Sequence, residues 1–300
     1  MKKFAETIRS VGLIANVDKP SAKALVRRAT AALRADGLAV ATDDATHRFA
    51  SLGEDAVPHA DARELARHAD LILVFGGDGT MLCVARQVAG ESTPILGINI
   101  GGLGFLTGVP SARLSQALKQ IRAGDFTLEQ RPLIQARGRL PGGPFDQCAL
   151  NDFVISRGSA SRMIELEVRV DDEIVTAYRC DGLIVSSPTG STAYSLSAGG
   201  PIVNPNAAVF VLTPICPHTL SDRSLIVSLN STIRVEVRSE RLEILLTADG
   251  QVQTVLASGG QVTIRRHRRA VRLMRLGGDS FYSTLRTKLH WSGNNLERPA

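Results

Sequence analysis

Between residues 11 and 125, short hydrophobic runs alternate with segments of helical periodicity. The run Leu71–Phe75 contains no polar residue, as is typical of a strand that helices cover on both faces. Further strands are predicted over 11–15, 38–41 and 94–100, and helices over 21–36, 61–69, 81–89 and 111–122. Strict alternation of strand and helix predicts an α/β domain with a doubly wound, Rossmann-like parallel sheet.

The chain from residue 131 onward follows a different pattern. Hydrophobic and polar residues alternate along 164–170 and 233–238, and again along 242–246. A period of two is typical of strands with one buried and one exposed face, as in antiparallel sheets. The dipeptide Asp249-Gly250 then favours a tight hairpin turn. This part is therefore predicted to be an antiparallel, β-rich domain.

The change of pattern places a domain boundary near residue 130, although no low-complexity linker marks it. We expect an α/β domain over 1–130 and a β-rich domain over 131–277. A short helix is predicted over 283–289, and the segment 278–300 could return to complete the first domain.

Composition narrows the class of protein. With 44% hydrophobic residues and a net charge of +6, the chain is too apolar for a disordered protein. It has 27 glycines but only one Trp, three Tyr and nine Phe, so Ala, Val, Leu and Ile must build the core. A basic balance suits a polyanionic partner, and both nucleic acid and phosphorylated small molecules fit that description.

The cysteines and the N-terminus bear on the compartment. The four cysteines show no metal-binding spacing, and reduced thiols are their simplest interpretation. No signal peptide and no hydrophobic stretch of membrane-spanning length is present in the sequence. We therefore expect a cytoplasmic protein without a membrane partner.

The strongest charge run is Arg265–Arg269. Aromatic residues are not interleaved with it, as they often are in single-strand nucleic-acid sites. We therefore expect a solvated strand end or turn, or a subunit contact, and no nucleic-acid partner.

A first glycine cluster, Gly76-Gly77-Asp78-Gly79, follows the Leu71–Phe75 strand and precedes a predicted helix. This is the carboxyl edge of the predicted parallel sheet, where α/β proteins bind ligands. Bare backbone at a helix N-terminus suits a phosphate group. The alternative is a turn that needs glycine for its backbone geometry alone.

Asp78 is the informative residue of that cluster. A carboxylate repels phosphate unless it binds Mg²⁺ or accepts a proton from an attacking hydroxyl, and both tasks belong to phosphoryl transfer. The sequence has no GxxxxGK[ST] motif and no GxGxxG motif. The pattern predicts a kinase without a P-loop.

Two further segments are candidates for ligand contact. Gly101-Gly102-Leu103-Gly104 follows the next strand and could place more bare backbone beside the first cluster, or serve as an interdomain hinge. The segment 181–201 is rich in small and hydroxyl residues, which suits a polar ligand held along its length.

Taken together, these motifs resemble those of the NAD kinase family. The resemblance rests on Gly-Gly-Asp-Gly at 76–79, Asn-Asp at 151–152, the 181–201 segment, and the Thr213-Pro214 and 217–221 motifs. It covers most of the chain, and 1–60 is the least distinctive part. Gly-Gly-Asp-Gly is shared with 6-phosphofructokinases and diacylglycerol kinases, whereas the 181–201 segment is much more specific.

The resemblance implies ATP-dependent phosphorylation of the 2′-hydroxyl of the adenosine ribose of NAD, giving NADP. It also implies Mg²⁺ or another divalent cation as cofactor, and a homo-oligomer, either dimer or tetramer. Asp78 would accept the proton of that hydroxyl, and Gly79 would let the substrate approach the backbone. Asn151 and Asp152 would hold the adenosine portion, and Asp181 would contact the nicotinamide half across a subunit boundary.

The remaining positions that match family ligands of the dinucleotide are Arg162, Arg179, Thr192, Ala193, Tyr194, Ser195, Leu196, Ser197 and Gln251. Arg162 is the least certain of them, because relatives can carry a histidine there. Two alternatives stay open on the sequence: a lipid or sugar kinase that uses the same Gly-Gly-Asp-Gly site, and a nucleotide-binding regulator without turnover.

Overall fold

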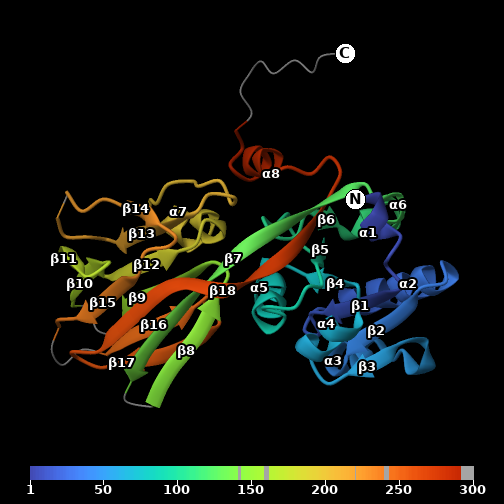
Figure 1. Ribbon diagram of the computed structural model, residues 1–300, viewed down its shortest axis with the longest axis horizontal. Helices are drawn as coiled ribbons and strands as arrows, with labels where there is room; N and C mark the ends of the chain where they lie inside the picture. The colour runs from blue at the N-terminus through green and yellow to red at the C-terminus, as the bar shows by residue number, and fades with distance from the viewer. Residues whose placement is uncertain (141–142, 159–161, 220, 240–242, 292–300) are drawn as a thin grey trace. The chain divides into compact units, whose positions relative to one another are not determined.

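A computed structural model describes residues 1–140, 143–158, 162–219, 221–239 and 243–291 (Figure 1). Leu220 and Leu242, both part of predicted patterns, lie outside the described residues. The chain forms two compact units. Unit 1 comprises 1–130 and the chain from Val271 onward, and unit 2 comprises 131–270.

Unit 1 is an α/β structure built on a parallel sheet. Its strands are hydrogen-bonded in the order β3-β2-β1-β4-β5-β18, where β18 is Gln261–Leu276, and every pair is parallel. Its elements are α1 (Lys2–Ala5), β1 (Ser10–Ala15), α2 (Ser21–Ala35), β2 (Ala39–Asp43), α3 (Asp44–Ala50), β3 (Val57–His59), α4 (Ala62–His68), β4 (Leu71–Gly76), α5 (Asp78–Gln87), β5 (Ile95–Asn99), β6 (Val109–Pro110), α6 (Leu114–Ala123) and α8 (Phe281–Lys288).

Helices bury both faces of this sheet, which explains the uninterrupted hydrophobic run of β4. Leu71, Leu73 and Phe75 pack in one cluster with residues of α2 and α6. On the other face a Cβ at Gly12 would lie 3.0–3.1 Å from side-chain atoms of Ile72 of β4 and Leu65 of α4, so glycine allows close packing there. The central strands β1 and β4 of the parallel sheet therefore have apolar surroundings on both faces.

The helix after β4 begins three residues earlier than expected. The sequence predicts its start at Met81, but α5 starts at Asp78, with Gly77 as its N-cap. Two glycines and an aspartate are typical of a turn, and that composition concealed the first helical turn. Asp78 is consequently a residue of the helix N-terminus rather than of the preceding loop.

Unit 2 consists of antiparallel strands in two sheets. One runs β14-β13-β12-β9-β16-β17, and the other contains β11, β10, β15 and β18 in that order, with β7 paired to β18 and to β8. The strands are β7 (Phe126–Leu140), β8 (Gly143–Ala149), β9 (Asp152–Arg157), β10 (Ile164–Val170), β11 (Glu173–Cys180), β12 (Gly182–Ser186), β13 (Val209–Ile215), β14 (Leu225–Ser228), β15 (Ile233–Val237), β16 (Ile244–Ala248), β17 (Val252–Leu256) and β18 (Gln261–Leu276). Strands β7 and β18 contribute residues to both units.

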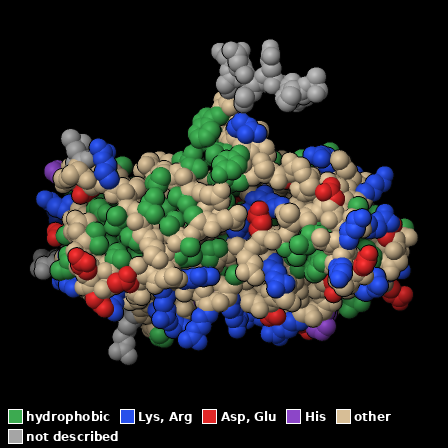
Figure 2. Space-filling model, turned by 45° about the horizontal axis from the view of Figure 1, so that its top comes forward, with side chains coloured by type: hydrophobic (Ala, Val, Ile, Leu, Met, Phe, Trp, Pro, Cys, Tyr) green, Lys and Arg blue, Asp and Glu red, His purple; other side chains and the backbone are tan. Residues whose placement is uncertain are grey.

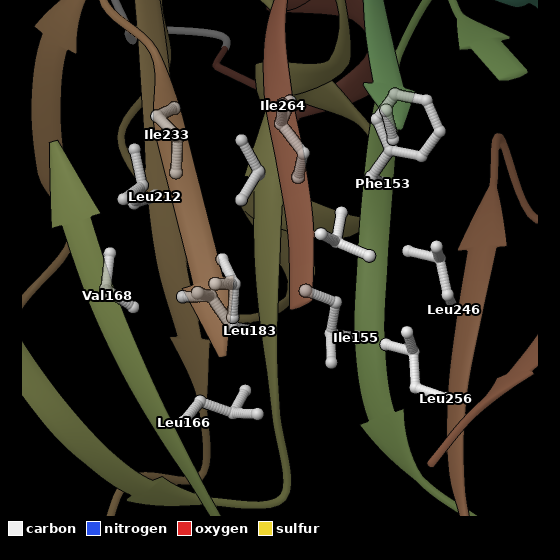
Figure 3. Packing of buried hydrophobic residues seen from close by; sticks show 14 of the residues in the cluster. Phe153, Ile155, Leu166, Val168, Leu183, Leu212, Ile233, Leu246, Leu256 and Ile264 are labelled. Atoms are coloured by element: carbon white, nitrogen blue, oxygen red, sulfur yellow. The ribbon is translucent and has the colours of Figure 1, made fainter. Parts of the chain in front are cut away.

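The inward residues of the two sheets form one hydrophobic core (Figure 3). Leu166 and Val168 of β10 come from one sheet, and Phe153, Ile155 and Leu183 come from the other. This is the buried half of the period-two pattern seen in the sequence. The predicted fold class, a parallel α/β domain followed by an antiparallel β-rich domain, is confirmed.

The prediction for Arg265–Arg269 was wrong in its local structure. These residues lie within the long strand β18, not at a strand end or in a turn. Four of the five side chains are exposed, so the charges are solvated while the backbone stays in the sheet. A charge run gives no period-two signal, and that is why the strand was missed.

Candidate functional site in each unit

Asp78 follows β4 at the topological switch point of the parallel sheet of unit 1, where the strand order reverses. The chain proceeds from β1 to β2 on one side, while β4 lies on the other side of β1. At such a switch point the loops after the two central strands diverge and leave a crevice at the carboxyl edge. The Asn16 N–H, directly after β1, donates to the carbonyl oxygen of Phe75 in β4 at 2.9 Å, which joins the two strand ends there.

The carboxylate of Asp78 is held by the chain segment 105–107. Oδ2 accepts one hydrogen bond, from the Phe105 N–H at 2.8 Å. Oδ1 accepts three, from the Leu106 N–H at 3.1 Å, the Thr107 N–H at 3.2 Å and the Thr107 hydroxyl at 3.0 Å. The side chain is therefore fixed before any ligand arrives.

The second glycine cluster lies directly against this carboxylate. A Cβ at Gly104 would collide with Asp78 Oδ1 and with the Thr107 hydroxyl, so only glycine allows the approach. Both clusters belong to unit 1. The expectation that they lie side by side is correct, and the hinge interpretation has no support in this contact.

Unit 2 holds a pocket of about 360 Å³ where β9 begins and β16 ends. Four of the predicted site residues line it, together with two that the sequence suggested only as a turn. They are Asn151, Asp152, Ala193, Tyr194, Asp249 and Gly250.

Asp249 organises the backbone at this pocket. Its carboxylate accepts hydrogen bonds from the N–H groups of Leu150 at 3.0 Å, Asn151 at 2.7 Å and Asp152 at 3.3 Å. Three backbone donors thus satisfy the hydrogen-bonding capacity of a buried side chain. Sequence reasoning missed this role, because Asp249-Gly250 is also an ordinary hairpin signal, and the three donors lie almost a hundred residues earlier.

The carboxyl group of Asp152 is 4% exposed and lies close to this charge. Burial, and after it the charge of Asp249, together raise the pKa of Asp152 to about 7. A group that loses its proton near neutral pH can exchange between a hydrogen-bond donor and an acceptor toward a ligand hydroxyl.

The raised pKa of Asp152 predicts a pH dependence of stability. Between its ordinary value of 3.8 and about 7, the folded chain retains a proton that the unfolded chain has lost. The free energy of unfolding therefore falls as pH rises through this window. Asp152→Asn removes the effect, so its stability relative to the unmodified chain should improve by about 2–3 kcal/mol from pH 5 to pH 8. Urea unfolding at both pH values measures this, and an equal difference at pH 5 and pH 8 would contradict it.

The segment after β12 folds into a 3₁₀ turn at Thr189–Thr192 and the short helix α7 (Tyr194–Ser197). The Ser195 and Thr213 hydroxyls are buried and 2.8 Å apart. A Cβ at Gly190 would collide with the backbone of Asn151, so this segment packs directly on the pocket. Ser195 is thus a buried support of the segment, while Tyr194 is exposed.

The other predicted site residues of unit 2 do not line the pocket. Asp181 forms an ion pair with Arg157, with 2.9 Å between Asp181 Oδ1 and Arg157 Nε. Arg162, Arg179 and Gln251 are exposed on the surface. Thr192, Leu196 and Ser197 belong to the helical segment around Tyr194.

The described residues contain no group of three or more His, Cys, Asp and Glu side chains placed to hold a metal ion. Within the same residues, every helix is too short or too polar to cross a lipid bilayer.

Comparison with known proteins identifies relatives of both units. The family model for the ATP-NAD kinase N-terminal domain matches residues 11–126, and that for the ATP-NAD kinase C-terminal domain matches residues 150–276. The NAD kinase of Syntrophotalea carbinolica is 42% identical over 95% of this chain and 99% of its own length. That of Moorella thermoacetica is also 42% identical, over 98% of this chain and 94% of its own.

Two solved structures share the fold. The yeast NADH kinase complexed with NADH superposes with a TM-score of 0.86 at 23% identity, covering 97% of this chain and 90% of that one. The NAD kinase from Archaeoglobus fulgidus in complex with ATP gives 0.73 at 26% identity, covering 95% of this chain and all of that one.

Proposed function

The chain belongs to the ATP-NAD kinase family, and on that premise we propose that it transfers the γ-phosphoryl group of ATP to the 2′-hydroxyl of the adenosine ribose of NAD. The products are NADP and ADP. The observation that carries the proposal within the chain itself is Asp78, a carboxylate fixed at a helix N-terminus at the switch point of the sheet.

Unit 1 supplies the proton acceptor. The ribose oxygen attacks the γ-phosphorus, the bond from that phosphorus to the departing ADP oxygen breaks, and the hydroxyl proton passes to Asp78. Helix α5 begins at Asp78 with Gly77 as its N-cap, so the positive end of its dipole lies beside Asp78 and favours a phosphate group there. Positioning and charge stabilisation account for most of the rate in this class of reaction.

Unit 2 supplies the dinucleotide pocket. Asn151 and Asp152 hold the ribose and adenine portion, because amide and carboxyl groups match the donors and acceptors of a diol. The backbone around Ala193 and Tyr194 forms the facing wall. The family resemblance alone supports further contacts to the dinucleotide by Asp181, Arg162, Arg179, Thr192, Leu196, Ser197 and Gln251.

Mg²⁺ fits this site as a cation carried by the triphosphate. The described residues hold no group of three or more metal-binding side chains, and Mg²⁺ commonly takes one or two protein ligands with several phosphate or water oxygens. When bound, the ion neutralises the charge that develops on the transferring phosphate. Asp78 orients the acceptor hydroxyl and receives its proton whichever oxygens hold the ion.

A coupled assay tests the proposed function. The protein is incubated with NAD, ATP and Mg²⁺, and NADP is measured with an NADP-specific dehydrogenase. Parallel reactions with NADH and with inorganic polyphosphate define the acceptor and the donor. NADP formation with ATP is the expected result, and its absence with every donor would overturn the proposal.

We also propose that the protein is a homo-oligomer joined through unit 2. Hydrophobic side chains gather on the face of unit 2 shown in Figure 2. Strand β11 lies at the edge of its sheet, and Ile174 there is 56% exposed. An edge strand with exposed apolar residues pairs readily with a second copy.

Light scattering after size exclusion tests the oligomer. The mass should be a multiple of the 32.1 kDa chain mass, and Ile174→Lys should shift it toward the monomer. Val57→Lys is the matched control, because Val57 is 60% exposed on the edge strand β3 of unit 1. A monomeric unmodified chain, or equal effects of the two variants, would contradict the proposal.

A further inference from the structure

Asn99 and Thr107 form a buried polar network behind Asp78. Asn99 is the last residue of β5 and is 4% exposed, and Thr107 is completely buried. The Asn99 amide group donates to the Thr107 hydroxyl at 3.0 Å and to the Gly102 carbonyl at 2.6 Å, and it accepts from the Gly101 N–H at 2.6 Å. One side chain therefore closes the glycine loop and connects it to Thr107.

The network has a fixed direction. The partners of Asn99 determine its orientation, because a carbonyl requires the NH₂ group and an N–H requires the oxygen. Thr107 Oγ1 therefore accepts from Asn99, and its single proton is available to Asp78 Oδ1 at 3.0 Å. Hydrogen bonds run from Asn99 through Thr107 to Asp78, and each strengthens the next.

The network distinguishes the two oxygens of Asp78. A carboxylate has four acceptor positions, two on each oxygen. Among the residues that the structure describes, Oδ1 accepts three hydrogen bonds, more than its two lone pairs, whereas Oδ2 accepts one, from the Phe105 N–H. Oδ2 is thus the oxygen with capacity for a further proton.

We propose that Asn99 and Thr107 are positioning residues for phosphoryl transfer, which anchor Asp78 through Oδ1 and direct Oδ2 to the attacking hydroxyl. The inference rests on the proposed function. In the reaction, the proton of the ribose hydroxyl passes to Oδ2 as the new P–O bond forms, and the electron pair of the broken P–O bond leaves with ADP. The contribution is geometric, because a base that rotates freely spends much of its time out of line with its proton.

Threonine 107 gives the direct test. Thr107→Val keeps the shape and removes the hydroxyl, and we expect kcat to fall about tenfold while KM for NAD and ATP changes less than about twofold. Thr107→Ser restores the hydroxyl and should recover most of kcat. Thr93→Val is the matched control, because the buried Thr93 hydroxyl also bonds backbone carbonyls of unit 1, those of Ala66 and Ala69, away from Asp78.

A double-mutant cycle separates positioning from general stability. In the Asp78→Asn background, Thr107→Val should lower kcat no further, since the base through which it acts is absent. Asn99→Ala is the second variant and should reproduce the kcat loss even if Thr107→Val folds poorly. If Thr107→Val matches Thr93→Val in kcat, or if its effect persists in full without Asp78, the inference is wrong. An unmodified protein that makes no NADP would instead contradict the proposed function.

Discussion

Replacing Asp78 by asparagine is expected to lower kcat by roughly 10³-fold while the dissociation constant for NAD stays within about threefold. Asparagine keeps an oxygen that can accept from Leu106 and Thr107, so only the bond from Phe105 is lost. The variant therefore retains the fixed loop but has no group that accepts a proton. Steady-state NADP formation and calorimetric titration with NAD measure the two quantities.

Asp70→Asn is the control for this substitution. Asp70 precedes β4, as Asp78 follows it, and its Oδ2 accepts the Arg9 and Ser10 N–H groups at 2.7 and 2.9 Å. It makes the same kind of bond at the opposite edge of the same sheet. A loss of stability without a loss of kcat is expected there. Near-normal kcat in Asp78→Asn would remove Asp78 from the chemistry.

Asp249→Ala should both destabilise unit 2 and abolish NAD binding at millimolar concentration. The substitution removes the acceptor of the buried N–H groups of Leu150 and Asp152 and of the partly buried N–H group of Asn151. Each unpaired group costs about 1–3 kcal/mol, and relief of repulsion with Asp152 offsets part of the sum. We expect the free energy of unfolding to fall by about 3 kcal/mol, measured by urea unfolding at pH 7.

Asp171→Ala is the matched control. Asp171 has a φ of 50°, against 51° for Asp249, and it also accepts a backbone N–H, from Thr232 at 2.7 Å. Because Asp171 is exposed, water can replace its carboxylate, and the cost should be much smaller. Similar losses in both variants would show that backbone strain, rather than the buried donors, controls stability at Asp249.

The fold could be predicted where hydrophobic periodicity was strong. The uninterrupted hydrophobic run Leu71–Phe75 indicates a strand covered on both faces. The alternation along 164–170 indicates a strand with one buried and one exposed face. The first turn of α5 and the centre of β18 were missed. At α5 glycine obscured the helical pattern, and the loop 105–107 stabilises the first turn through its hydrogen bonds to Asp78. At the centre of β18 a run of charges obscured the strand pattern, and neighbouring strands stabilise the backbone.

The candidate site could be predicted only in part. Asp78 stands in a motif with unusual composition, so the sequence alone draws attention to it, whereas Asn151 entered only through the family resemblance. Asn99 and Asp249 do not stand in such a motif, since an asparagine after a strand and an aspartate before a glycine are common in turns. Their importance arises from partners brought close by the fold. Asp249 bonds N–H groups 97 to 99 residues away in sequence, a contact that no local pattern contains.

The cysteines of unit 2 differ in a way that matters for labelling chemistry. Burial raises the pKa of Cys180 to about 12, so this thiol stays protonated and unreactive at neutral pH. Cys216 is the exposed one among the chain's four cysteines, and it directly follows β13, whose Ile215 pairs with Gly182 beside Asp181. A thiol-reactive fluorophore should therefore attach at Cys216 ahead of Cys180. The dye would report spectroscopically on the surface where the nicotinamide half of the dinucleotide is expected.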